Sequence, residues 1–351
     1  MKILIVRSGL LGDTLVALPA IWHLKELYPD AMFIYLYDDH DHKVKAPDVL
    51  GGSGLLDEMM PLIKYGGLGL RIKNLLGVWI KLLGHRIDRA YILEEDHWTS
   101  KKRFLLGAAL VKQIICPSGQ TAAMPRDSHG RLMVLDSIAD NLLAGIGGPP
   151  GTLPGKGCGH FELPLSHSER NFSKVWLQKM GILSTESKLF AVGAWSNMPL
   201  KRWPMQRWID VIHYLHQAYG LVPVFLGGTE EQPFLNEICA FSKMGVVGAG
   251  LLSVRESAAV LSHTQFYLGN DTGIMHLAVA VGKPCVALFS ARESPGRWYP
   301  YGKNHQVLQM RPRCEGCMLT ECIEHNMQCI MDITVPQVIS ACETVIGKLE
   351  I

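Results

Sequence analysis

The sequence predicts an α/β protein with two Rossmann-like domains that face a cleft. Short apolar runs alternate with helical patterns along almost the whole chain, which is typical of β-α-β units and a mostly parallel sheet. The pattern is interrupted by AGIGGPPGTLPGKGCG (144–159), a stretch dense in Gly and Pro, and then restarts. A length of 351 residues also favours two domains.

The expected elements follow in chain order. In the first half we expect strands at Lys2–Val6, Met32–Tyr37, Arg89–Leu93 and Gln113–Ile115, with helices at Leu15–Leu27 and Leu70–Leu83. A short strand at His160–Leu163 and a helix at Glu169–Lys179 come next. In the second half we expect strands at Leu189–Gly193, Val222–Leu226, Gln265–Leu268 and Cys285–Phe289, with helices near Met205–Tyr219, Ser253–Leu261 and Gly273–Val281.

The domain boundaries follow from these elements. We expect an N-terminal Rossmann-like domain over 1–165, a linker region over 166–185 and a C-terminal Rossmann-like domain over 186–334. The last helix, at 335–351, has no strand after it and is expected to pack back on the N-terminal domain. Ligands of such sheets bind beyond the carboxyl ends of the strands, so the residues just after each strand are the candidates for function.

Composition excludes several classes of protein. Apolar residues make up 48% of the chain and charged residues 19%, so it can bury substantial cores. A net charge of +2 is too balanced for a nucleic-acid binder. No apolar run approaches the ~18 residues that span a bilayer, and Arg7 and Gly9 cut short the N-terminal run. We therefore expect a cytoplasmic protein, whose nine cysteines are thiols or metal ligands.

The strongest local signal is YLGNDTGIMHLAVAVGKPCVALF, in which a strand ends at Asn270 and a helix begins at Gly273. The exposed amides of this helix start, with the Thr272 hydroxyl, would cradle phosphate oxygens. His276 lies one turn further on and could donate a hydrogen bond to the same phosphates. Asp271 fits beside a phosphate only if it faces a ribose hydroxyl or a cation. The alternative makes Asp271 and Thr272 a plain helix cap and His276 a semi-buried residue.

A second cluster, GAWSNMPLKRWP (193–204), follows the first strand of the second domain. Ser196, Lys201 and Arg202 converge in this loop, and the Lys201 ammonium suits the charge of a diphosphate leaving group. The alternative is a solvated loop anchored by its two tryptophans.

A third segment, FLGGTEEQPF (225–234), leaves a strand through two glycines. Glu230 or Glu231 could hold ribose hydroxyls there, as acidic residues do in nucleotide sites. The alternative is a pair of first-turn acids that satisfy the helix dipole.

The N-terminal turn RSGLLGDTLVALPA differs from a dinucleotide-binding turn, because Asp13 stands where such turns avoid a charge. No G-x-G-x-x-G follows either leading strand, which argues against a dehydrogenase.

R-x-G-x-x-G-D-x-L-x-x-x-P, K-R-W-P and N-D-T-G-x-x-H-L-A occur together and in order. With them the chain resembles glycosyltransferase family 9, the ADP-heptose:lipopolysaccharide heptosyltransferases, over nearly its full length. The resemblance implies a GT-B fold, with the acceptor bound mainly by the first domain and the nucleotide-sugar by the second. It implies an inverting transfer of heptose from ADP-heptose to the inner core of lipopolysaccharide.

The resemblance also implies roles for individual residues. Asp13 resembles the catalytic base, and Lys201 the lysine that binds the donor phosphates. The donor-binding turn corresponds to Asp271, Thr272, Gly273 and His276, the ribose-binding acid to Glu230 or Glu231, and the adenine pocket to Leu251 or Leu252.

The chemistry suits these residue types. A single displacement at the anomeric carbon needs a base on the acceptor hydroxyl and a stabilised diphosphate. Fixed cationic and amide groups can supply that stabilisation, so no cofactor is required in principle. Gly12 would let an acceptor approach the backbone closely.

The loop EEDHWTSKKRF (94–104) carries Lys101, Lys102 and Arg103, which could meet an anionic acceptor such as a Kdo carboxylate or a phosphate. The alternative is a solvated basic start to the next helix. The loop SARESPGRWYPYG (290–302) differs from the shorter turn expected in the family.

Two further segments leave alternatives open. RCEGCMLTECIEHNMQC places Cys314, Cys317, Cys322 and Cys329 at spacings that could hold a structural zinc or iron, with reduced thiols or partial disulfides as the alternative. LRIKNLLGVWIKLLGHR (70–86) mixes apolar and basic residues, which suits a membrane-surface helix. Its apolar residues cover much of the circumference, so we expect a core helix.

The expected partners are an ADP-sugar donor and a lipid-linked or glycan acceptor, with no nucleic acid. Contact with the cytoplasmic face of the inner membrane is expected to be peripheral at most. The rivals are a related transferase acting on a protein, an antibiotic aminocyclitol or another glycan, a GT-B-fold nucleotide-sugar epimerase, and a non-catalytic nucleotide-sugar binder.

Overall fold

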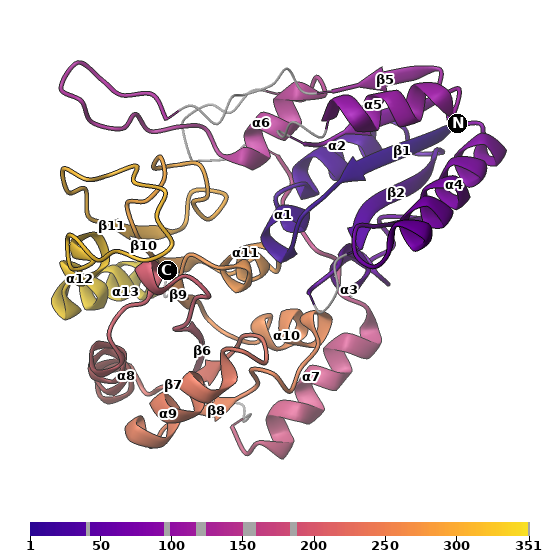
Figure 1. The fold of residues 1–351 in the computed structure, drawn as a ribbon. Coiled ribbons are helices and arrows are strands. Elements are labelled where there is room, and N and C mark those ends of the chain that lie inside the picture. Colours follow the sequence, from indigo (N-terminus) through magenta and orange to yellow (C-terminus); the bar gives the residue numbers. More distant parts are fainter. Residues whose placement is uncertain (40–42, 95–98, 117–123, 150–158, 183–187, 350–351) are drawn as a thin grey trace. The chain divides into compact units, whose positions relative to one another are not determined.

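The computed structural model describes the chain except for residues 40–42, 95–98, 117–123, 150–158, 183–187 and 350–351. Two compact units make up the protein, each built on its own parallel sheet (Figure 1). Unit 1 comprises Met1–Ala123, Ile138–Leu153 and Gly157–Pro164, and unit 2 comprises Met124–Ser137, Pro154–Lys156 and Leu165–Ile351. The predicted α/β class with two Rossmann-like domains is confirmed. Most of the expected Gly/Pro-rich connection lies outside the described residues.

Unit 1 has a five-stranded parallel sheet in the order β3-β2-β1-β4-β5. Its strands are β1 (Lys2–Arg7), β2 (Met32–Asp39), β3 (Glu58–Ile63), β4 (Arg89–Ile92) and β5 (Gln113–Ile115). Strand β3 was not predicted, because its Pro61 weakens the strand pattern. This strand is an edge strand, the position in a sheet that accommodates proline.

The helices of unit 1 are α1 (Leu11–Leu15), α2 (Leu18–Leu27), α3 (Ala46–Leu50), α4 (Leu68–His85), α5 (Thr99–Ala108) and α6 (Ile138–Gly145). One core cluster joins Leu4 and Val6 of β1 to Ile34 of β2, Val78 of α4 and Leu106 of α5. The strand side chains are buried because both faces of a parallel sheet are covered.

The exposure of α4 contradicts the expected core helix. Only Val78 and Leu82 of its 18 residues are buried. Apolar residues do surround much of this helix, but a single face meets the sheet and the rest faces outward. Among the described residues, no helix is both long and apolar enough to cross a membrane.

Unit 2 has a six-stranded parallel sheet in the order β11-β10-β9-β6-β7-β8. The strands are β6 (Lys188–Gly193), β7 (Leu221–Phe225), β8 (Val246–Val247), β9 (Tyr267–Asn270), β10 (Cys285–Phe289) and β11 (Gln306–Gln309). The two edge strands, β8 and β11, were not predicted. Gly193 pairs with Gly269, so the carboxyl ends of β6 and β9 lie next to each other.

The helical elements of unit 2 are α7 (His167–Lys179), the 3-10 turn η1 (Pro199–Lys201), α8 (Met205–Tyr219), α9 (Gln232–Ser242), α10 (Val254–Leu261), α11 (Gly273–Ala280), α12 (Gln328–Met331) and α13 (Val335–Leu349). The expected packing of the last helix on the N-terminal domain is replaced by packing on unit 2. Val338, Cys342 and Val345 of α13 join the core of unit 2, where α13 contacts α8, β10 and β11. Its apolar face completes that core.

The segment expected to be a linker, 166–185, contains a helix of unit 2. Ser166 caps α7 through a capping box with Glu169, and Glu169 also accepts two hydrogen bonds from Arg255 of α10, at 2.7 and 2.8 Å. These bonds outweigh burial and lower the pKa of Glu169 to about 2. The expected strand at His160–Leu163 is absent from the structure at those residues.

A piece of the first half of the chain also belongs to unit 2. The Leu132 amide donates to Oε1 of Glu315 at 2.8 Å, and Arg126 donates to the Glu315 carbonyl at 2.6 Å. These bonds tie the segment Met124–Ser137 to the loop that carries the cysteine cluster. The sequence alone does not indicate that this segment belongs to unit 2, because the assignment depends on hydrogen bonds between distant segments.

Candidate active site

The carboxyl ends of β6 and β9 are held around the buried phenol of Tyr267. Its hydroxyl lies 3.5 Å from the Gly193 carbonyl oxygen and 3.4 Å from that of Asn270, with the Thr272 side chain nearby. A Cβ at either Gly193 or Gly269 would come within 2.2 Å of the Tyr267 oxygen. Both strands therefore need glycine where they pass this hydroxyl. Tyr267 was not predicted as a site residue, although the glycines at 193 and 269 are a sequence signal that points to it.

This arrangement brings the two central motifs of unit 2 together. Lys201, at the end of η1, places its Nζ 2.5 Å from Oδ2 of Asp271, the residue directly after β9. Both side chains are largely buried, which strengthens their attraction. The pairing explains how a carboxylate can stand in a predicted phosphate site, because Lys201 supplies the cation that Asp271 needs.

Helix α11 begins directly after this ion pair. Thr272 occupies its N-cap position, but the Thr272 side chain makes no capping hydrogen bond. The plain cap considered from the sequence is therefore not formed, and the Thr272 side chain lies near the Tyr267 hydroxyl instead. Gly273 opens the helix, and the amides of a first turn are donors suited to an anion.

His276 lies one turn into α11 and is almost fully buried. Its ring stacks edge-on against Trp298, with 6.1 Å between ring centroids. The Trp298 indole N–H donates to Oε2 of Glu293 at 3.0 Å, and Glu293 in turn pairs with Arg292. The loop after β10 thus supports His276 through Trp298, a residue that the sequence analysis did not single out.

Glu230 and Glu231, which the sequence analysis could not separate, differ in their surroundings. Glu230 is exposed, whereas Glu231 is partly buried at the N-cap of α9. Gly227 leaves room for the Glu231 carboxylate, since a Cβ there would come within 1.9 Å of Oε2. Burial raises the pKa of the Glu231 carboxyl to about 7, and its neighbour Glu230 adds to the shift.

Two further predicted donor residues lie at the same edge of the sheet. Ser196 is buried, and its Oγ accepts the Met198 amide at 3.2 Å within its own loop. Leu252 is partly buried beside Gly248, whereas Leu251 is largely exposed.

In unit 1, the predicted base Asp13 lies in α1, beyond the carboxyl end of β1. Its Oδ2 accepts the Leu10 amide at 2.9 Å, and its Oδ1 lies 3.5 Å from Nη2 of Arg7. Gly9 has a φ of +116°, and a Cβ there would clash with the Asp13 side chain at 2.3 Å. The carboxylate is thus held over Gly9 while its side chain stays 35% exposed. Gly12 lies beside Asp13 in the same short helix.

The expected acceptor-binding lysines need correction at Lys102. Its side chain is buried and pairs with Glu94, and its Nζ donates to the Ser8 hydroxyl at 2.5 Å. Lys102 therefore stabilises the end of β1 from inside and is not presented to an anionic acceptor. Arg103 is exposed, and the Lys101 side chain lies outside the described residues.

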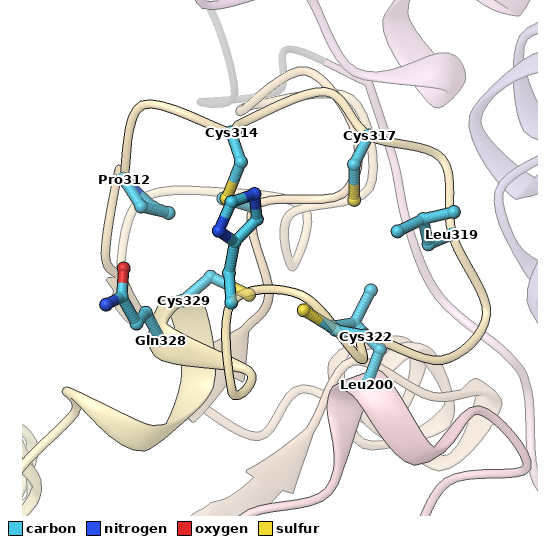
Figure 2. Close-up of a pocket in the computed structure, with 10 residues that line it drawn as sticks. Leu200, Pro312, Cys314, Cys317, Leu319, Cys322, Gln328 and Cys329 are labelled. Carbon is cyan, nitrogen blue, oxygen red and sulfur yellow. The ribbon is translucent and has the colours of Figure 1, made fainter.

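The four clustered cysteines line one small cavity. Figure 2 shows the sulfur atoms of Cys314, Cys317, Cys322 and Cys329 directed into it. Its volume is about 20 Å³, roughly the space of one water molecule. Within the described ranges, however, no three Cys, His, Asp or Glu side chains are placed to hold a metal ion. The described side chains are therefore not arranged as the structural zinc or iron site that the spacing suggested.

The comparisons with known proteins agree with this architecture. Residues 160–328 match the sequence profile of "Glycosyltransferase family 9 (heptosyltransferase)". Lipopolysaccharide heptosyltransferase 2 of Escherichia coli (strain K12) is 24% identical, with 97% of each chain covered.

Two solved structures share the fold. A glycosyl transferase family 9 protein of Veillonella parvula has a TM-score of 0.76 at 21% identity, covering 99% of this chain and 97% of its own. The ADP-heptose lps heptosyltransferase II of E. coli has a TM-score of 0.73 at 19% identity, with both chains fully covered.

The fold and these matches define the protein as a glycosyltransferase of the GT-B class. More narrowly, the chain carries a glycosyltransferase family 9 domain over residues 160–328, which confirms the resemblance drawn from its motifs. The matched range contains Lys201, Asp271, Thr272, Gly273 and His276.

Proposed function

We propose that this protein transfers heptose from ADP-heptose to the inner core of lipopolysaccharide, with inversion at the anomeric carbon. The names of the similar proteins support this substrate class. The observation that carries the proposal is the Lys201–Asp271 ion pair, which joins two distant motifs next to the start of α11. Such a group of a lysine and free helix amides is suited to a diphosphate.

Unit 2 holds the donor in this proposal. Lys201 and the amides of Gly273 and the next residues bind the diphosphate oxygens, with His276 as a hydrogen-bond donor. Glu231 accepts hydrogen bonds from the ribose hydroxyls, because it is the acid that the local fold turns inward. Leu252 lines the adenine pocket, and Ser196 shapes the loop that carries Lys201.

Unit 1 supplies the base. Asp13 takes the proton of the acceptor hydroxyl, whose oxygen forms a bond to the anomeric carbon as the bond to the β-phosphate breaks. The ADP that leaves carries the electron pair, and Lys201 neutralises the developing charge. Arg7 and the Leu10 amide orient the carboxylate for this step. Gly12 and Arg103 remain the proposed acceptor contacts on this unit.

A nucleotide screen followed by a product assay tests the proposal. ADP-heptose should raise the melting temperature more than UDP- or GDP-sugars do, and the wild type should transfer heptose to truncated lipopolysaccharide. Transfer to a protein, an aminocyclitol or another glycan alone would assign a different acceptor. Epimerisation without any acceptor would contradict the proposed transfer.

A further inference from the structure

Helix α4 presents a continuous apolar row on its outer side. Leu68, Ile72, Leu76 and Ile80 recur every four residues and therefore form one ridge along the helix. Their exposed fractions are 72%, 48%, 53% and 62%. Large contiguous apolar surfaces of this kind mark interaction sites in soluble proteins. The helix is the violet one at the right edge of Figure 1.

This ridge is not needed to attach α4 to its unit. The side of the helix opposite Leu76 and Ile80 buries Val78 and Leu82 against the sheet. Asn74 makes two further hydrogen bonds with β3. Its Nδ2 donates to the Pro61 carbonyl oxygen at 3.1 Å, and its Oδ1 accepts the Ile63 amide at 2.8 Å. The fold therefore fixes α4 by one face and leaves the other available.

The charges on α4 identify the chemistry of the partner. Arg71, Lys73 and Lys81 are exposed, and the helix contains no acidic residue. No ion pair is formed by these three side chains with any carboxylate in the described part of the chain. Exposed apolar residues together with uncompensated cations are typical of helices that lie in the interface of an anionic membrane.

We propose that the ridge of Leu68, Ile72, Leu76 and Ile80 inserts into the headgroup region of an anionic lipid bilayer, with Arg71, Lys73 and Lys81 binding its phosphates. A second copy of the chain is a poorer occupant, because a symmetric contact would bring like charges together. The proposal rests on α4 alone and holds whatever sugar the enzyme transfers.

Vesicle flotation of the full-length protein tests the proposal. At low salt the wild type should bind phosphatidylethanolamine vesicles that contain about one third phosphatidylglycerol, and bind pure phosphatidylcholine much less. Replacing two ridge residues, Leu76→Gln with Ile80→Gln, should weaken binding at least about tenfold. Removing the charges, Lys73→Gln with Lys81→Gln, should weaken it about fivefold per lysine and flatten its salt dependence.

Matched changes on α7 serve as controls. Val175→Gln replaces an equally exposed apolar residue, and Lys179→Gln removes an exposed lysine, so both should bind like the wild type. Leu68→Gln with Ile72→Gln repeats the test on the other half of the ridge if the first pair melts early.

Three results would overturn the proposal. The wild type could fail to bind the anionic vesicles, or both ridge pairs could bind as tightly as the wild type. Sedimentation could also show a wild-type dimer that the ridge variants convert to a monomer, which would assign the ridge to a second copy. Transfer to a lipid-free acceptor should survive in the ridge variants, so a failed transfer assay and a failed flotation assay remain distinguishable.

Discussion

Lys201 Nζ lies 2.5 Å from Asp271 Oδ2, although the two residues are 70 positions apart in the chain. The Gly193–Gly269 pairing of β6 with β9 brings them together, since the loop of Lys201 and the turn of Asp271 leave adjacent strand ends. A buried ammonium held by one carboxylate is ready to exchange part of that contact for an incoming diphosphate. The ion pair therefore positions the Lys201 ammonium and neutralises the buried charge of Asp271.

Replacing this lysine should weaken donor binding. Lys201→Ala removes a charge-assisted contact worth about 1.5–3 kcal/mol and leaves Asp271 unpaired beside the phosphates. We expect ADP to bind at least about tenfold more weakly in calorimetry, and transfer to slow. Lys188→Ala, at the exposed start of β6, is the control and should bind ADP normally. Unchanged ADP affinity in Lys201→Ala would remove this lysine from the donor site.

The Tyr267 hydroxyl should matter to the donor turn and not to the core. Tyr267→Phe keeps the ring and removes the contact to Thr272, so we expect a several-fold rise in the KM for donor with the KM for acceptor unchanged. Because the two hydroxyls act together, Tyr267→Phe and Thr272→Val should be non-additive in a double-mutant cycle. Tyr35→Phe, in unit 1, is the matched control for a fully buried tyrosine. Strict additivity of the cycle would contradict the coupling.

Glu231 predicts a pH dependence of stability. Its pKa is raised to about 7, so the folded protein holds a proton that the unfolded chain releases near pH 4.5. The stability that this proton confers is complete below about pH 4.5 and is lost as the pH rises through 7. Relative to the wild type, Glu231→Gln should therefore gain stability across this range. Thermal melts at several pH values would show it, and Glu237→Gln, at an exposed acid of the same helix, should follow the wild type.

The cysteine cavity predicts a protein without stoichiometric metal. The described structure brings no three ligands into position, so purified wild type and a Cys317→Ser, Cys322→Ser variant should both contain little zinc or iron. Elemental analysis by mass spectrometry measures this directly. One equivalent of metal in the wild type, lost in the variant, would restore the interpretation drawn from the cysteine spacing.

The elements of the two sheets were predictable where the apolar pattern is strong. Met205–Tyr219 and Cys285–Phe289 begin and end at the predicted residues, as does the short edge strand Gln113–Ile115. The missed strands, β3, β8 and β11, are all at sheet edges, where burial is partial and the apolar pattern is weak. Edge strands are specified by their neighbours as much as by their own residues.

The candidate site was predictable as motifs but not as contacts. The sequence singled out Asp13, Lys201 and Asp271, while the contact between Lys201 and Asp271 depended on the pairing of β6 with β9. The inward direction of Lys102 was not predictable, because it follows from the position of Glu94 beyond another strand. The exposed face of α4 also escaped prediction, since a helix apolar on most sides has the composition of a buried one.

The proposed chemistry is tested most directly by a transfer assay of the wild type and Asp13→Asn. The assay measures the rate of transfer and the anomeric configuration of the product. We expect the wild type to join heptose from ADP-heptose to truncated lipopolysaccharide with inversion. Asp13→Asn should bind ADP-heptose normally but transfer about 10²–10⁴-fold more slowly, and Asp30→Asn, an exposed acid of unit 1, should transfer normally. Retention of configuration, or near-normal transfer by a folded Asp13→Asn protein, would contradict it.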